Sequence, residues 1–251
     1  MRSMIPLVVV LLGGIGVAGC GAPVATQTAD VPAVRIADAA LESGNPGIVL
    51  RVVAGMLAKN PRDMAALLRQ GTANAMLGQN AEAEHSYRRA LAIEPDNRKA
   101  RLGLAKAMLA SNPAQAEQLY TAYLQSDPAN ADALNNLGVA RDMQGHHPEA
   151  QLAYRKALAA APDLVSAKQN LGLSLAMSGQ AGAGAAMLSQ VVADGAADQR
   201  TRDNYAMALA LDGHSGQAGK MLRQDMSATD ATAALAAYTE FSATTPPVIS
   251  P

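Results

Sequence analysis

A pattern of small and large apolar residues recurs about every 34 residues along this chain of 251, and no other feature constrains the fold as strongly. Its clearest copy spans 131–164 and contains Gly138, Gly145, Ala150 and Pro162 at fixed intervals. Proline cannot continue a helix, and a glycine between two helical stretches allows a tight turn. Each copy is therefore predicted to be a pair of helices. One such pair cannot bury its apolar face alone, so successive copies should stack.

Five further copies share this register, with boundaries at 30–63, 64–97, 98–130, 165–198 and 199–228. The copy at 98–130 is one residue short, which places a deletion in the turn around Asn112. The spacing is that of the tetratricopeptide repeat (TPR), a helix–turn–helix unit. We predict an all-α fold: a right-handed TPR superhelix (30–228), a capping helix at 229–242 and a disordered tail at 243–251. The alternative is an Ala-rich helical bundle whose periodicity arose by chance.

Composition agrees with packed helices and narrows the range of functions. Hydrophobic residues make up 49% of the chain but aromatic residues only 3%, with one Phe and no Trp. The core must then consist mainly of Ala, Leu, Met and Val, which suits closely packed helices better than sheets. The formal net charge is −1, so the basic excess typical of a nucleic-acid-binding protein is missing.

The N-terminus reads as a targeting segment. Residues 1–19 hold one cation followed by an apolar run that ends before Cys20, the only cysteine of the chain. This pattern predicts a lipoprotein signal peptide, lipidation of Cys20 and a flexible tether over 20–31. Gly21, and not Asp, follows the cysteine. By resemblance to the enterobacterial lipoprotein sorting rule, this implies the periplasmic face of the outer membrane over retention at the inner membrane. A plain secretory signal or a short N-terminal anchor are the alternatives.

No set of residues points to catalysis. The sequence lacks a phosphate-binding loop and a nucleophile elbow, and His146 and His147 form a pair without a third metal ligand. We therefore predict a protein that is not an enzyme, with no catalytic residues, no metal, no cofactor and no small-molecule substrate.

A groove is the alternative to a catalytic site, since the first helix of each TPR unit lines the concave face of such arrays. In the predicted register the inward candidates are Leu68, Thr72, Met76, Lys99, Leu102, Lys106, Asn135, Val139, Asp142, Met143, Gln169, Leu173, Met177, Asp203, Met207 and Leu211. Methionine side chains adapt to varied partners, and amides can pair with an extended backbone. Several of these residues could instead serve the core between repeats, and the convex face or the tether could carry the binding.

The order of the last three units resembles a known family. Residues 134–147, 170–179 and 202–213 are similar to the TPR lipoproteins of tight-adherence (Flp/Tad) pilus assembly, the TadD-like family. The resemblance covers roughly 33–242, although the first unit is degenerate and Asp225 replaces a small residue. It implies a pilotin-like scaffold that helps assemble or localise the pilus secretin, with the secretin or other Tad components as partners. The alternatives are another TPR lipoprotein (a type IV pilus pilotin, a barrel-assembly accessory or a cell-wall enzyme adaptor) and a soluble periplasmic enzyme subunit or carrier.

Overall fold

The computed structural model describes residues 31–195 and 197–244, and in that part of the chain it contains thirteen helices and no strand. The helices are α1 (Val31–Glu42), α2 (Pro46–Lys59), α3 (Met64–Met76), α4 (Asn80–Leu91), α5 (Arg98–Met108), α6 (Pro113–Leu124), α7 (Ala131–Asp142), α8 (His147–Ala160), α9 (Val165–Met177), α10 (Ala181–Ala193), α11 (Gln199–Leu211), α12 (Ser215–Leu222) and α13 (Ala228–Thr244). The prediction of an all-α solenoid is confirmed. The predicted signal peptide, Cys20 and most of the tether lie outside the described residues.

Each of the six predicted units contains one antiparallel helix pair, from α1 and α2 to α11 and α12. Helix α13 follows the last pair and packs against both α11 and α12. It occupies the place of the predicted capping helix and continues to Thr244, two residues into the segment predicted to be a tail. The remainder of that segment, 245–251, lies outside the described residues.

Short polar side chains fix the start of most first helices. Asp63, Asn97 and Asn130 each accept a hydrogen bond at 3.0 Å from the backbone N–H three residues later. This side-chain cap satisfies one of the amide groups that a helix leaves unpaired at its N-terminus. A proline stands two residues before each of these caps, so the preceding helix cannot run on.

The turns within the units use the predicted glycines. Gly145, Gly179 and Gly213 have φ angles of 77°, 85° and 82°, a left-handed conformation that costs glycine little. The third unit has no such glycine: α5 ends at Met108, and Asn112 caps α6 through the Gln115 amide. The predicted deletion therefore falls in the turn between α5 and α6, where an asparagine cap takes the place of a left-handed glycine.

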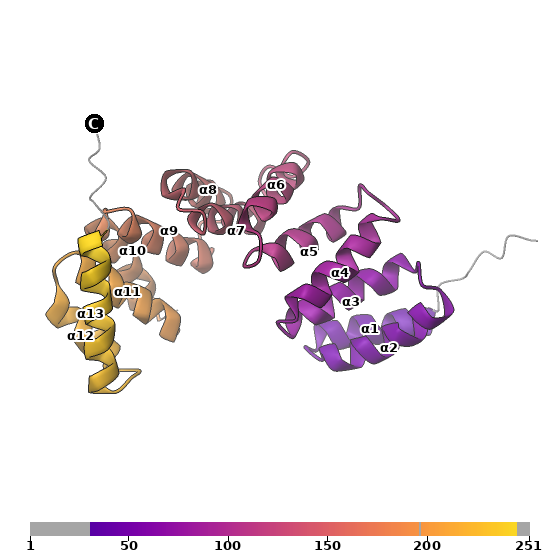
Figure 1. Ribbon diagram of the computed structural model, residues 1–251, viewed down its shortest axis with the longest axis horizontal. Coiled ribbons are helices and arrows are strands. Elements are labelled where there is room, and N and C mark those ends of the chain that lie inside the picture. The colour runs from indigo at the N-terminus through magenta and orange to yellow at the C-terminus, as the bar shows by residue number, and fades with distance from the viewer. Residues whose placement is uncertain (1–30, 196, 245–251) are drawn as a thin grey trace, which may run out of the picture.

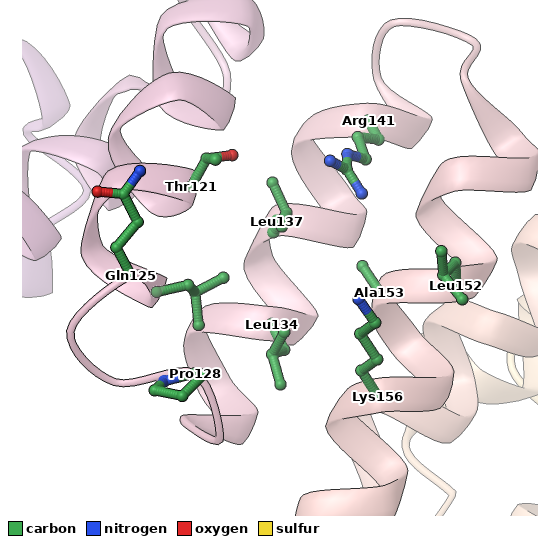
Figure 2. Close-up of a pocket in the computed structure, with 10 residues that line it drawn as sticks. Thr121, Gln125, Pro128, Leu134, Leu137, Arg141, Leu152, Ala153 and Lys156 are labelled. Atoms are coloured by element: carbon green, nitrogen blue, oxygen red, sulfur yellow. The ribbon is translucent and has the colours of Figure 1, made fainter.

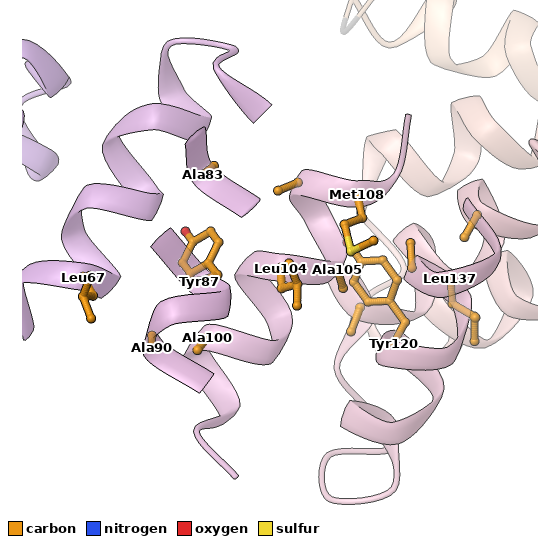
Figure 3. Close-up of a cluster of buried hydrophobic side chains, with 14 of the residues drawn as sticks. Leu67, Ala83, Tyr87, Ala90, Ala100, Leu104, Ala105, Met108, Tyr120 and Leu137 are labelled. Carbon is orange, nitrogen blue, oxygen red and sulfur yellow. The ribbon is translucent and has the colours of Figure 1, made fainter. Parts of the chain in front are cut away.

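Aromatic rings pack directly on helix backbones. A Cβ at Gly138 would overlap the Tyr154 ring, and Tyr154 is 1% exposed. In the same way the Tyr87 ring fills the space above Gly71 and Gly103. Figure 3 shows Tyr87 and Tyr120 within a continuous cluster of buried Ala, Leu and Met side chains. The small residues of the motif thus allow the few aromatic residues to be buried between helices.

The stacked pairs form an arch (Figure 1). Helices α1 to α5 make one limb, α9 to α13 the other, and α6 to α8 lie at the crown. Around the crown and second limb, α5, α7, α9 and α11 line the inner side, while α6, α8, α10 and α12 lie outside. Consecutive first helices pack against each other from α1 to α5 and from α7 to α11. Among the described residues, α5 and α7 share no comparable contact.

Candidate protein-binding site

Equivalent positions on successive inner helices form three rows, spaced about 34 residues apart. The first row holds Leu68, Leu102, Asn135, Gln169 and Asp203; the second holds Thr72, Lys106, Val139, Leu173 and Met207; the third holds Met76, Met143, Met177 and Leu211. Within one helix the rows are separated by about one turn, so they share a face. These rows contain all the predicted groove residues except Lys99 and Asp142.

The second and third rows present an uncharged apolar strip on α7, α9 and α11. Met143 is 49% exposed, and Leu173 and Met207 are half-buried. Val139 and Leu211 differ, because Val139 also packs against the buried cluster that contains Tyr154 and Leu211 against the one that contains Leu209. Flexible thioether side chains beside aliphatic ones can adapt to the shape of an apolar partner segment.

The first row holds amides that bridge successive units. The Asn170 Nδ2 donates to Asn135 Oδ1 at 2.9 Å, linking α9 to α7. The Gln169 Nε2 donates to the hydroxyl of Thr201 on α11. Asn135 is buried. These two side chains therefore already have partners inside the array, where the sequence suggested pairing with a bound backbone.

Asp142 connects three helices. Its Oδ2 accepts from the Tyr154 hydroxyl at 2.8 Å, and its Oδ1 accepts from the Ser174 hydroxyl at 2.8 Å. The His147 Nδ1 lies 2.8 Å from the same Oδ1. Burial raises the pKa of the Tyr154 hydroxyl, and the charge of Asp142 raises it further. The carboxylate of this predicted groove residue is therefore engaged in joining α7, α8 and α9.

Asp203 lies where α13 covers the end of the array. Its Oδ1 is buried and has no hydrogen-bond partner within the part of the chain that the structure describes. Burial raises the pKa of this carboxyl, and the negative charge of Asp225 raises it further. Burial likewise raises the pKa of the Tyr238 hydroxyl on α13, with a contribution from the Asp203 charge. The capping helix thus closes this end of the groove around a carboxylate that is poorly solvated.

The first limb gives the concave side a basic section. Lys99 and Lys106 on α5 are exposed, and Leu102 between them is half-buried. The hydrogen bonds from Arg69 lower the pKa of Asp38, and the charge of Lys99 lowers it further. Among the predicted groove residues, two kinds of surface are therefore open to a partner: the cations on α5 and the apolar strip on α7, α9 and α11.

A cleft that the sequence did not predict opens on the outer side of the crown. It lies between α6 and α8 with α7 as its floor, and has a volume of about 330 Å³ (Figure 2). Apolar side chains dominate its lining: Leu124, Leu134, Leu137, Leu152 and Ala153. Thr121, Gln125, Pro128, Arg141 and Lys156 complete it. The small side chain of Ala153 is a trace of this cleft in the sequence, but it is not specific, because the same position of the second unit holds the equally small Ser86.

The described residues contain no group of three His, Cys, Asp or Glu side chains placed to hold a metal ion. His147 faces Asp142, while His146 and His214 are exposed at the N-caps of α8 and α12. Within 31–195 and 197–244, no helix combines the length and apolar character needed to span a bilayer.

Comparison with known proteins agrees with the repeat architecture of the helix pairs. Two tetratricopeptide repeat family models match, one at residues 74–112 and one at 107–165. The structure is similar to PilW, a widely conserved type IV pilus biogenesis factor, with a TM-score of 0.69 and 18% identity over 80% of this chain and 94% of PilW. A search of the curated proteins gives no match.

Two further solved structures share the architecture. A TPR protein from Parabacteroides merdae matches with a TM-score of 0.65 and 15% identity, over 87% of this chain and 94% of the other. A thermophilic TPR protein from Thermus thermophilus matches with a TM-score of 0.57 and 19% identity, over 71% and 98%. The class is therefore that of tetratricopeptide repeat folds. The chain contains tetratricopeptide repeats and is similar in fold to PilW, and the matching models indicate no catalytic family.

Proposed function

We propose that this protein is a lipid-anchored outer-membrane scaffold that helps assemble or localise the secretin of a Flp/Tad pilus, in the manner of a pilotin. The apolar strip on the concave side of the arch carries the proposal, because it offers a preformed surface to a partner segment. The signal-peptide pattern ending at Cys20 supports the anchor, and the resemblance to TadD-like lipoproteins supports the choice of pilus.

The mechanism is tethering combined with capture. Acyl chains on Cys20 hold the array at the membrane surface, where two lipid signals give a stable attachment and one does not. Confinement to that surface raises the effective concentration of the array near a membrane-bound partner. The strip formed by Leu173, Met177 and Met207 receives apolar side chains of the partner, and the cations on α5 receive its acidic residues.

A second candidate is a role in type IV pilus biogenesis. The fold similarity to PilW favours it, since 94% of that structure is matched. Both candidates require a protein partner and differ only in the pilus machinery that supplies it. The partner's identity separates them.

The experiment starts from the native membrane, with wild type and the Cys20→Ala and Leu173→Asp variants purified through a C-terminal tag. We expect Cys20→Ala to lose incorporation of a labelled fatty acid and to leave the outer-membrane fraction. We expect Leu173→Asp to remain lipidated and helical but to retain much less secretin. Persistent labelling of Cys20→Ala would refute the anchor, and recovery of a type IV pilus component in place of the Tad secretin would favour the second candidate.

A further inference from the structure

The cleft at the crown lies beside a repeat position that holds a small apolar residue, Ala153 on α8. The same position holds Val52 on α2 and the small, buried Ser86 on α4, whereas the longer Leu119, Met187 and Met221 occupy it on α6, α10 and α12. Those three long side chains each pack against a buried cluster in their own part of the array. The methyl group of Ala153 leaves the corresponding space between α6 and α8 open (Figure 2).

The lining of the cleft is apolar at its floor and cationic at its rim. Leu134 and Leu137 on α7 form the floor, and Leu152 on α8 is 52% exposed at the edge. Arg141 is already paired with Glu117 at 2.8 Å. Lys156 also lines the cleft and is exposed, with no acidic partner among the described residues. The charged group at this apolar surface that is open to a partner is therefore the Lys156 ammonium.

We propose that this cleft binds a short amphipathic helix of a partner protein, one with aliphatic anchors and an acidic side chain placed to pair with Lys156. An apolar cleft between helices offers few groups to an extended backbone, and the described residues have no strand edge to pair with one. A helix satisfies its own backbone hydrogen bonds and can insert side chains at i, i+3, i+4 and i+7. The site lies on the outer side of the crown, apart from the concave strip.

A second copy of this chain fits the cleft less well. The free face of α1 is the most exposed apolar helix surface, with Ile36 54% exposed. Its neighbour on that face is Arg35, so docking it into the cleft would bring a cation towards Lys156 and Arg141. Charge complementarity therefore favours an acidic partner helix.

The test uses the full chain and two synthetic helical peptides of about 14 residues with Leu at i, i+3, i+4 and i+7. One peptide carries a Glu beside the Leu face, and the matched peptide carries Lys at that place. Fluorescence anisotropy measures binding to wild type and to three variants: Ala153→Met, which fills the cleft with the residue of the next unit, Leu152→Asp and Lys156→Glu. Ile48→Asp, an exposed apolar site on α2, is the control.

We expect the Glu peptide to bind wild type about fivefold more tightly than the Lys peptide, and Lys156→Glu to reverse that preference. Ala153→Met and Leu152→Asp should weaken binding at least about tenfold, while the Ile48→Asp control retains it. Ala153→Met should keep or raise thermal stability, so its loss of binding cannot be attributed to unfolding. Equal binding of both peptides, binding that survives Ala153→Met, or sedimentation showing dimers through the cleft would each overturn the proposal.

Discussion

Replacing Asp142 with Ala should destabilise the array strongly, because this one carboxylate accepts hydrogen bonds from two buried hydroxyl groups. Tyr154 is 1% exposed and Ser174 is fully buried, so both hydroxyls lose their acceptor at a place with little access to water. An unsatisfied buried polar group costs about 1–3 kcal/mol. His147 is partly exposed and should contribute less. We expect a total loss of about 2–5 kcal/mol, a large share of the stability of an ordinary domain.

Urea denaturation followed by far-ultraviolet circular dichroism measures the free energy of unfolding. Asp142→Asn should lose less than Asp142→Ala, since the amide keeps one oxygen acceptor. A double-mutant cycle with Tyr154→Phe isolates one contact, and we expect a coupling free energy of at least about 0.5 kcal/mol.

The control for this series is Asp194→Ala, an exposed acidic residue at the C-cap of α10. Its unfolding free energy should stay within about 0.5 kcal/mol of wild type. If Asp142→Ala proved as stable as this control, or if its effect added to that of Tyr154→Phe without coupling, the carboxylate would not join the helices as described.

Three further perturbations test other parts of the structure. Ala150→Arg places a long charged side chain in a fully buried position and should cost several kcal/mol or prevent folding, so a melting curve like that of wild type would contradict the packing. Asp203→Asn should raise stability at neutral pH by up to about 1 kcal/mol, because burial disfavours the ionised form. That gain should shrink on acidification: a raised folded-state pKa means the wild type becomes more stable as the pH falls through it, as thermal melts across pH would reveal. Hydrogen bonds from Arg202 lower the pKa of Asp225, so this pair should stabilise the fold above the ordinary carboxyl range and lose its effect as the pH falls through the folded-state pKa. In Asp225→Ala that acid-side loss of stability should be smaller, and an unchanged pH profile would argue against the pair.

The repeat motif made the architecture predictable because each of its positions has a steric cause. The ring of Tyr154 fits only because Gly138 has no side chain, and the turn at Gly145 needs a left-handed backbone. These requirements act within one unit or between adjacent units, so a period of 34 residues reveals them. The period also placed the inner helices and the three rows of groove residues along them.

The partners of individual polar side chains were not predictable in this way. Asn135 and Gln169 lie on the predicted face, yet each is hydrogen-bonded to a residue of the next unit. Which neighbour an amide reaches depends on the distance between two helices and on side-chain rotamers, and the period determines neither. The cleft was not predictable for another reason: no motif marks it, and the small residue beside it, Ala153, has an equally small counterpart in Ser86 of the second unit.

The first helices stack directly on one another within each limb, whereas α5 and α7 are linked mainly through α6, which packs against both. The buried cluster continues from α3 to α8 across the crown, so opening the limbs would separate packed side chains there. The arch should therefore keep its curvature at the crown. Any change in its span has to pass through α6, which also forms one wall of the cleft.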